Sequence, residues 1–308
     1  MFNIVKAMFL LLFLSLLAHA EARAFTQGDP KIIGGDVADY GDWPSTVALF
    51  STTDDEAPYC GGALITSRWV ITAAHCVKGK KAANIFIRVG TTNLNDNRSG
   101  ERRKIKKIII HPKYNVFTFD SDLALLELKN ITTIETIPLF IGSPQADTPT
   151  AVVGWGTQNV NPLTGEGFNP SKQLYELQLP IVSQTQCKLI MEDLNDLGPI
   201  TNNMICAGTG LGGEDTCQGD SGGPLMALQN DEIRLVGIIS WGSGCANTFT
   251  YGVYTRLNKF SKWIKSYTEA KPNDKDESTG GSIFWLIFPL SGILLIYRKV
   301  KNNKDHIK

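Results

Sequence analysis

The sequence predicts an all-β fold of the sandwich or barrel class for residues 32–255. Short apolar runs rich in Val, Ile, Thr and aromatic residues recur along this region, each bounded by Gly, Pro, Asn or Asp. Runs of this length and spacing are typical of strands, and the 29 glycines of the chain supply many turns. The expected strands are residues 45–50, 62–66, 69–73, 84–89, 105–110, 123–128, 151–153, 174–182, 224–228, 235–241 and 252–255.

One helix is expected, near the end of this region. Phe260, Trp263, Ile264 and Tyr267 recur at helical spacing, which places their side chains on one face. No other segment between the expected strands has a persuasive helical pattern, and the sequence contains no internal repeat. The domain is therefore expected to consist almost entirely of strands and to end in a single helix.

The composition excludes one broad class of protein and gives no hint of a polyanionic partner. Hydrophobic residues make up 43% and charged residues 19% of the 308 residues, which excludes an intrinsically disordered chain. The 30 basic and 30 acidic residues give a net charge of zero, so nothing indicates a nucleic-acid partner. The length allows either one large all-β domain or two small ones.

Residues 1–31 indicate an exported protein. Lys6 precedes the apolar run 7–18, which is too short to span a bilayer, and the alanines at 18, 20, 22 and 24 offer small-x-small cleavage sites. We interpret residues 1–20 as a signal peptide, with its end between 20 and 24, and residues 21–31 as a pro-segment; a buried core helix is the alternative. An oxidising compartment favours three disulfides among the six cysteines, and the spacing leaves their pairing open.

A different composition begins after residue 268. Residues 269–282 form a polar linker with no apolar side chain larger than Ala or Pro. Residues 283–297 are strongly apolar and predict a transmembrane segment, although a helix of this length rises only about 22 Å. The basic tail 298–308 is expected on the cytoplasmic side, and its polar residues argue against a cleaved lipid-anchor signal.

Three separated motifs carry side chains suited to nucleophilic catalysis. Ser221 lies in the glycine-rich turn 219–224, which would expose a hydroxyl and bring backbone N–H groups close to a bound carbonyl. His75 closes an apolar run, and Asp122 enters a buried strand, where an acid needs a partner. A turn serine, a structural histidine and a turn-capping aspartate are the alternatives, and Asp120 is a rival acid.

In the order His75, Asp122 and Ser221, these motifs resemble the trypsin-like serine proteases. The resemblance extends from Ile32 to about Tyr267. Its further motifs are Ile32-Ile33-Gly34-Gly35, Cys60-Gly61-Gly62, Gly154-Trp155-Gly156 and Ser240-Trp241-Gly242-Ser243-Gly244-Cys245. It implies two six-stranded antiparallel β-barrels with a C-terminal helix over residues 32–268 and the catalytic groups at their junction. It also implies the disulfides Cys60–Cys76, Cys187–Cys206 and Cys217–Cys245.

The resemblance implies a role for each member of the triad. His75 would take the proton of the Ser221 hydroxyl as the oxygen attacks the scissile carbonyl, and Asp122 would orient the imidazole. The D-x-A-L-L pattern favours Asp122 over Asp120 as this acid. The backbone N–H groups of Gly219 and Ser221 would form the oxyanion hole.

The resemblance also implies a zymogen. Cleavage after Lys31 would free the ammonium of Ile32, which would pair with the carboxylate of Asp220 beside the nucleophile. The pro-segment contains no cysteine, so it would be released. An activating protease is therefore an expected partner, and self-activation is possible because the bond follows a basic residue.

The substrate pocket is implied in the same way. Asp215 lies six residues before Ser221, where trypsin-like members carry the acid that pairs with a substrate Arg or Lys. Small residues keep the pocket open, and the strand end 240–242 would pair with the substrate as an added strand. The expected substrate-binding residues are Asp215, Thr216, Gln218, Ser240, Trp241, Gly242 and Gly252.

No cofactor is expected to be required, and no metal site is assigned. The loop 91–99 lacks the glutamates that hold calcium in many members, so calcium dependence is doubtful. Tyr251 occupies a position at which members with Tyr often bind sodium, so sodium near the pocket is an alternative. A run of bases at 98, 102–104, 106 and 107 is expected to be a solvated strand face, and an exosite for anionic substrates is the alternative.

The C-terminal segment has two interpretations. One is the type I membrane anchor of a cell-surface protease. The other rests on Thr279-Gly280-Gly281-Ser282, on Trp285 and on the basic residues that follow, which resemble the GlyGly-CTERM tail of Gram-negative bacteria. A rhombosortase removes such tails before surface display or release by type II secretion. The short apolar span favours this second interpretation.

Together these expectations describe an extracytoplasmic serine endopeptidase, secreted or surface-anchored, that hydrolyses protein or peptide substrates after Arg or Lys. A catalytically silent trypsin-like module for binding or adhesion is one alternative. A protease with chymotrypsin-like specificity is another. The presence of His75, Asp122 and Ser221 argues against the first, and Asp215 argues against both.

Overall fold

The computed structural model describes residues 35–52, 57–160, 167–192, 199–211, 219–242 and 249–269. Several sequence-based expectations concern residues outside these ranges, and they stay predictions. They are the leader, Lys31 and Ile32, Asp215, Thr216, Cys217, Gln218, Cys245, and all segments after residue 269. No helix of the described residues is long and apolar enough to cross a membrane, and the expected span 283–297 lies outside them.

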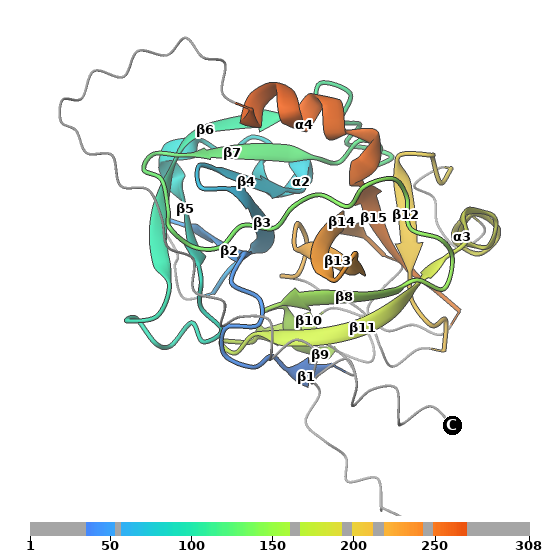
Figure 1. The fold of residues 1–308 in the computed structure, drawn as a ribbon, viewed down its shortest axis with the longest axis horizontal. Coiled ribbons are helices and arrows are strands. Elements are labelled where there is room, and N and C mark those ends of the chain that lie inside the picture. Colours follow the sequence, from blue (N-terminus) through green and yellow to red (C-terminus); the bar gives the residue numbers. More distant parts are fainter. Residues whose placement is uncertain are drawn as a thin grey trace, which may run out of the picture. The chain divides into compact units, whose positions relative to one another are not determined.

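The first half of the domain is a closed barrel of six antiparallel strands (Figure 1). The strands pair in the order β2-β3-β4-β7-β6-β5. Apolar side chains such as Val47, Ile87 and Leu125 are fully buried, and β2, β4, β5 and β7 are buried along nearly their whole length. The strands are β2 (Thr46–Ser51), β3 (Cys60–Thr66), β4 (Trp69–Thr72), β5 (Ile85–Val89), β6 (Glu101–Ile110) and β7 (Ala124–Leu128).

The second half forms another barrel of six antiparallel strands, paired in the order β11-β12-β15-β14-β13-β8 and closed by β8 against β11. The short strand β1 (Asp36–Val37) pairs with β11, and β9 (Thr157–Val160) and β10 (Gly167–Pro170) pair with each other. Two six-stranded antiparallel barrels are thus confirmed. The barrel strands are β8 (Pro149–Gly154), β11 (Tyr175–Val182), β12 (Met204–Ala207), β13 (Pro224–Gln229), β14 (Glu232–Trp241) and β15 (Gly252–Arg256).

Every expected strand overlaps a strand of the barrels. The strands that the sequence did not predict are β1, β9, β10 and β12, each of four residues or fewer. β12 has four buried residues, Met-Ile-Cys-Ala, so it shows no alternation of apolar and polar side chains. Short runs of this kind gain their structure from neighbouring strands rather than from their own pattern.

The expectation of a single helix was wrong. α3 (Gln184–Met191) lies in the second barrel, and the hydroxyl of Ser183 caps it by accepting from the backbone N–H of Gln186 at 3.2 Å. Only Cys187 and Met191 of this helix are buried, so the apolar face is too narrow to reveal it. α2 (Ala74–Val77) and the 3-10 turns η1 (Ala82–Asn84) and η2 (Leu257–Lys259) are too short to show periodicity.

Two of the three expected disulfides are present. Cys60 is bonded to Cys76, which joins β3 to α2. Cys187 is bonded to Cys206, which joins α3 to β12. The third expected pair lies outside the described residues.

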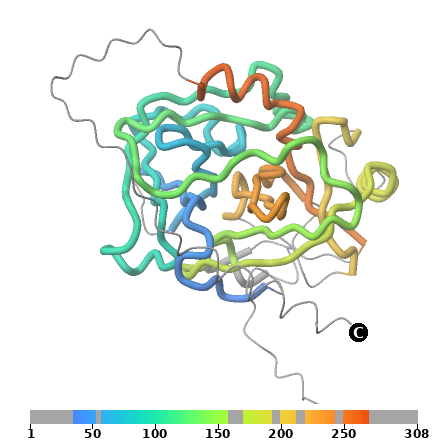
Figure 2. Tube along the Cα trace, in the orientation of Figure 1, coloured from blue at the N-terminus to red at the C-terminus, as the bar shows by residue number. Residues whose placement is uncertain are grey.

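The expected C-terminal helix is confirmed as α4 (Ser261–Thr268), and it packs against the first barrel although it follows the second in sequence. The ring of His111, just after β6, contacts the rings of Phe260 and Trp263 edge-on at centroid distances of 4.9 and 4.8 Å. Tyr267 reaches Trp69 of β4. Figure 2 shows this end of the coloured trace running beside the blue-green segments. α4 therefore fastens the end of the domain to its first half.

This packing predicts a pH-dependent stability. Burial lowers the pKa of His111 below its ordinary value, Lys113 lowers it further and Asp120 opposes the shift. The folded protein therefore favours the neutral imidazole, so the free energy of unfolding should fall as the pH drops below about 6.5. We expect His111→Gln to reduce the loss measured by urea unfolding between pH 7 and pH 5. An unchanged pH dependence in this variant would contradict the assignment.

Candidate active site

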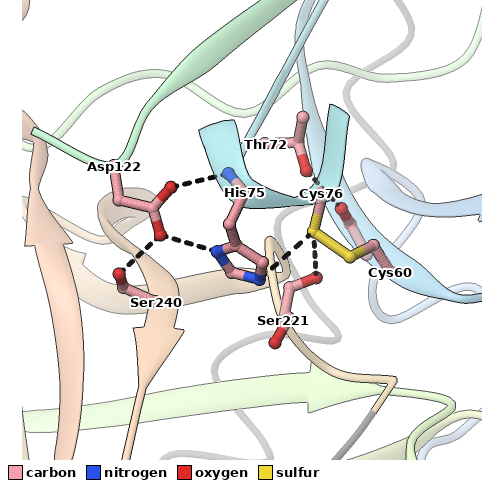
Figure 3. Close-up of a disulfide and its surroundings, with 8 residues drawn as sticks. Cys60, Thr72, His75, Cys76, Asp122, Ser221 and Ser240 are labelled. Carbon is pink, nitrogen blue, oxygen red and sulfur yellow. Dashed lines mark hydrogen bonds and ion pairs between the residues drawn. A yellow bond between two sulfur atoms is a disulfide. The ribbon is translucent and has the colours of Figure 1, made fainter. Parts of the chain in front are cut away.

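The three candidate catalytic residues come together where the two barrels meet (Figure 3). His75 lies on α2 and Asp122 just before β7, so both belong to the first barrel. Ser221 lies in the turn before β13 of the second barrel. The backbone N–H of Gly61 donates to the carbonyl oxygen of Ser221 at 2.8 Å, which ties the serine turn to β3 of the first barrel.

Asp122 is fully buried, and its carboxylate is surrounded by donors. Its Oδ2 lies 2.7 Å from Nδ1 of His75, and its Oδ1 accepts from the backbone N–H of His75 at 2.9 Å. Ser240 of β14 donates its hydroxyl to Oδ2 at 2.6 Å, and Thr255 of β15 donates to the backbone oxygen of Asp122 at 2.7 Å. A buried carboxylate beside Nδ1 favours the proton on that nitrogen, which leaves Nε2 as the basic one.

The imidazole of His75 lies between Asp122 and Ser221 (Figure 3). In the described part of the chain, the Ser221 hydroxyl forms no hydrogen bond to Nε2. Such a bond commonly tightens only when substrate is bound. The order Asp122, His75, Ser221 is the arrangement that lets a base take a proton from a hydroxyl and become an imidazolium stabilised by a carboxylate.

The turn that carries Ser221 requires glycine for two separate reasons. Gly219 and Gly222 have φ of 97° and 82°, a region that L side chains rarely adopt. A Cβ at Gly222 would also overlap the hydroxyl of Thr72 and the carbonyl of Gly61. The motif noted in the sequence therefore encodes a turn that only glycine adopts without strain and that packs closely against the first barrel.

A second buried carboxylate lies next to the candidate nucleophile. Asp220 is 1% exposed, and its Oδ1 accepts from the backbone N–H of Gly156 at 2.8 Å. A Cβ at Gly154 or Gly156 would overlap this carboxylate. The Gly154-Trp155-Gly156 motif is thus a cradle for Asp220, a role that the sequence alone did not reveal. Ile32, the expected partner of Asp220, lies outside the described residues.

Asp120, the rival acid, serves a different purpose. Its carboxylate accepts from the hydroxyl of Thr201 at 2.5 Å and from the side-chain amide of Asn203 at 3.0 and 3.1 Å. The hydroxyl of Ser121 also donates to it at 3.0 Å. Because Thr201 and Asn203 lead into β12, Asp120 connects the loop before Asp122 to the second barrel.

This loop has an unfavourable backbone on both sides of Asp120. Phe119 and Ser121 each have φ of 55°, which costs a residue with a side chain about 1 kcal/mol. The ring of Phe119 meets the imidazole of His75 edge-on at a centroid distance of 5.7 Å. The hydrogen bonds of Asp120 therefore hold a strained segment that positions both Phe119 and Asp122 against His75.

Part of the expected substrate pocket is described. Ser240 and Trp241 end β14, and Gly252 begins β15 beside it. Gly242 follows the end of β14 and is exposed. The backbone N–H of Tyr251 donates to the sulfur of Met191 at 3.3 Å, and sodium near this residue stays a prediction.

The side chain of Arg88 fills the loop 91–99, for which calcium dependence is doubtful. The guanidinium of Arg88 donates to the carbonyl oxygens of Leu94, Asp96 and Ser99 at 2.6, 2.8 and 3.1 Å. These are the oxygen ligands that a bound cation would otherwise use. Elsewhere in the described residues, the one cluster of metal-ligand types combines His75 with the Cys60–Cys76 disulfide, whose oxidised sulfurs are not thiolate ligands.

Within the described residues, acids pair with half of the basic run at 98, 102–104, 106 and 107. Arg103 lies 2.7 Å from Glu101, and Lys106 lies 2.8 Å from Glu127. Arg98 lies 3.6 Å from Asp96. These ion pairs favour a solvated strand face over an exosite for anionic substrates.

Comparison with known proteins yields one family. The family model described as Trypsin matches residues 32–264. Rat cationic trypsin-3 is 37% identical over 265 residues, covering 84% of this chain and 98% of the rat protein. Dog anionic trypsin is 38% identical over 262 residues, covering 83% and 96%. Mouse vitamin K-dependent protein C is 36% identical over 253 residues, covering 79% of this chain but only 53%, about half, of protein C.

The contacts of Asp120 predict a role in positioning. We expect Asp120→Ala to lower kcat for hydrolysis of a peptide amide about tenfold with little change in KM, because the loop that orients Asp122 and Phe119 loses its anchor. Asp120→Asn retains one acceptor oxygen and should restore part of the rate. The acid limb of the pH profile of kcat should also shift in Asp120→Ala. Wild-type kcat and an unchanged profile would contradict this role.

Proposed function

Because the chain belongs to the trypsin family of serine proteases, we propose that it is an endopeptidase that hydrolyses peptide bonds after Arg or Lys. The observation that carries the proposal is the buried pair of Asp122 and His75, 2.7 Å apart, with Ser221 on the other side of the imidazole. A silent binding module would have no need to keep a buried carboxylate, a basic imidazole nitrogen and a hydroxyl in line.

The reaction proceeds in two halves. Nε2 of His75 takes the proton as Oγ of Ser221 attacks the scissile carbonyl, and the same proton then passes to the leaving amine. Asp122 keeps the imidazole oriented and stabilises the imidazolium without taking its proton. The N–H groups of Gly219 and Ser221 stabilise the oxyanion. Water then repeats the sequence on the acyl-enzyme and frees Ser221.

The proposed specificity depends on Asp215 at the base of the substrate pocket. A buried carboxylate there rewards a guanidinium or ammonium and disfavours an apolar side chain. Gly242 and Gly252 leave room for the substrate side chain, and the strand end at residues 240–242, of which Gly242 is exposed, pairs with the substrate backbone. Thr216 and Gln218 complete the proposed pocket.

Activation is proposed to use the cradle around Asp220. Cleavage after Lys31 would supply the ammonium of Ile32 as a charge partner for a carboxylate that is 1% exposed. Asp220 lies between Gly219 and Ser221 in the chain. Fixing the position of Asp220 therefore also fixes the backbone N–H groups of both proposed oxyanion donors. Calcium is not needed in this scheme, since Arg88 already binds the carbonyl oxygens of its loop.

We propose an extracytoplasmic location for the mature domain, reached through the leader 1–20. The interpretation of residues 279–297 as a membrane anchor or GlyGly-CTERM signal, with a rhombosortase and type II secretion as partners, rests on sequence alone. Both interpretations place the protease domain outside the cytoplasm, because the basic tail follows the apolar segment.

Hydrolysis of matched peptide amides tests the function. The chain cleaved after Lys31 should turn over Arg and Lys substrates at least about a hundredfold faster than the Phe substrate, since the pocket carboxylate would lack a partner with Phe. Asp215→Ser should remove most of this preference. Ser221→Ala, cleaved in the same way, is the control for turnover by the activating protease itself. If this variant hydrolysed the peptides as fast as the wild type, the proposed mechanism would be wrong.

Processing offers an independent test. Lys31→Gln should leave the pro-segment attached and keep the proposed oxyanion site unformed, so its activity should stay below about 1% of that of the cleaved protein. Full activity of the uncleaved variant would exclude the zymogen.

The intact mass of the exported protein should correspond to a new N-terminus at Ile32, and a C-terminus that still carries Lys308 would exclude the sorting signal.

A further inference from the structure

The candidate base lies directly against a disulfide. Sγ of Cys76 is 3.6 Å from Nε2 of His75 and 3.5 Å from the carbonyl oxygen of Ser221 (Figure 3). In the part of the chain that the structure describes, Cys60, His75 and Cys76 are a group whose ligand atoms all lie within 4.8 Å of one another. Both cysteines are buried, whereas the side chain of His75 is 24% exposed. Solvent therefore reaches this group through the imidazole.

The imidazole is already oriented as a metal-binding histidine is. Its Nδ1 lies 2.7 Å from Oδ2 of the buried Asp122, so Nδ1 carries the proton and Nε2 keeps its lone pair. Histidines that bind a metal commonly donate their other N–H to a carboxylate in this way. A sulfur and a nitrogen that bind one tetrahedral zinc ion lie about 3.6 Å apart. The separation of Nε2 and Sγ of Cys76 thus matches that of two ligands of the same ion.

Only the bond between the two sulfurs stands against such a site. A thiol reductant that gives two electrons to the disulfide converts it to two thiols, and zinc displaces their protons on binding. Two thiolates on one zinc ion lie about 3.8 Å apart. Rotation of the Cys60 side chain allows this separation, because the two Cα atoms are 6.2 Å apart.

The backbone around the two cysteines is held independently of the disulfide. The carbonyl oxygen of Gly61 accepts from the hydroxyl of Thr72 at 2.7 Å, and its N–H donates to the carbonyl oxygen of Ser221 at 2.8 Å. These bonds connect β3, the end of β4 and the serine turn. Reduction therefore leaves the three ligands near one another.

We propose that Cys60, Cys76 and His75 bind Zn²⁺ when the disulfide is reduced, and that the bound ion inhibits the protease. The inhibition rests on the proposed function, because it concerns the base of that reaction. Two thiolates and an imidazole are ligands that zinc prefers, with water in the fourth position. Zinc on Nε2 occupies the lone pair that would take the proton of Ser221, so the hydroxyl is not activated.

Oxidation reverses the inhibition. Exchange with a disulfide-containing partner passes two electrons to that partner, forms the Cys60–Cys76 bond and leaves no thiolate to hold the ion. The ion returns to solution, and Nε2 of His75 is again a base. Formation of this disulfide in an oxidising compartment is thus a condition for activity that is separate from cleavage after Lys31.

Metal binding is tested on Ser221→Ala, which cannot digest itself, after reduction with a phosphine. Co²⁺ serves as a coloured probe for Zn²⁺. We expect a first equivalent of Co²⁺ to bind with a thiolate-to-cobalt charge-transfer band, only after reduction, and to be displaced by Zn²⁺. In this background, Cys60→Ala with Cys76→Ala should lack this equivalent, and His75→Ala should bind it at least about tenfold more weakly.

The matched control removes the other described disulfide. Cys187→Ser with Cys206→Ser, in the same background, should retain the first equivalent of Co²⁺. Zn²⁺ should also raise the melting temperature of reduced Ser221→Ala, which binding only to thiols of the unfolded chain would not do. Absence of the cobalt band after reduction, or equal binding by the His75→Ala protein, would overturn the inference.

Activity gives the last measurement. The chain cleaved after Lys31 and reduced in the presence of a chelator should lose at least about a hundredfold in kcat when saturating Zn²⁺ replaces the chelator, because the general base is blocked. The oxidised enzyme should lose far less at the same Zn²⁺ concentration, and equal inhibition of both forms would contradict the role of the thiolates. If the oxidised, cleaved chain fails to hydrolyse Arg and Lys peptides, the proposed function fails, and cobalt binding still decides the metal site.

Discussion

The buried carboxylate of Asp122 is the constraint on which the rest of the site depends. An ionised group removed from water is stable only when donors surround it, and here the donors come from both barrels. His75 belongs to the first barrel, whereas Ser240 and Thr255 belong to adjacent strands of the second. The two barrels must therefore meet in one relative position for this charge to be satisfied, and that position also brings Ser221 to the imidazole.

Two further carboxylates near the site, those of Asp120 and Asp220, are each held by hydrogen bonds outside the triad. Asp120 could compete for the imidazole, but Thr201 and Asn203 occupy its carboxylate. Asp220 is held in a glycine cradle that admits no side chain, so its position is set by backbone geometry. In each case groups remote in sequence bind the carboxylate and fix its position.

One loop contains a positive charge from a remote side chain. The guanidinium of Arg88 donates to three carbonyl oxygens of the loop 91–99. Lys78 and Lys80, in contrast, lie over the rings of Tyr114 and Tyr59. The groups around a basic residue thus decide whether it binds backbone oxygens or an aromatic ring.

The sequence by itself determined the longer strands, the last helix and the identity of the triad candidates, because these features rest on local patterns. Short apolar runs bounded by turn residues specify strands, and glycine at 219 and 222 specifies a turn that other residues rarely adopt. It could not reveal α3, whose buried face is two residues wide, or the cradle around Asp220. Only the tertiary structure decided the roles of Asp120 and Arg88, because each depends on partners that folding brings within hydrogen-bond distance.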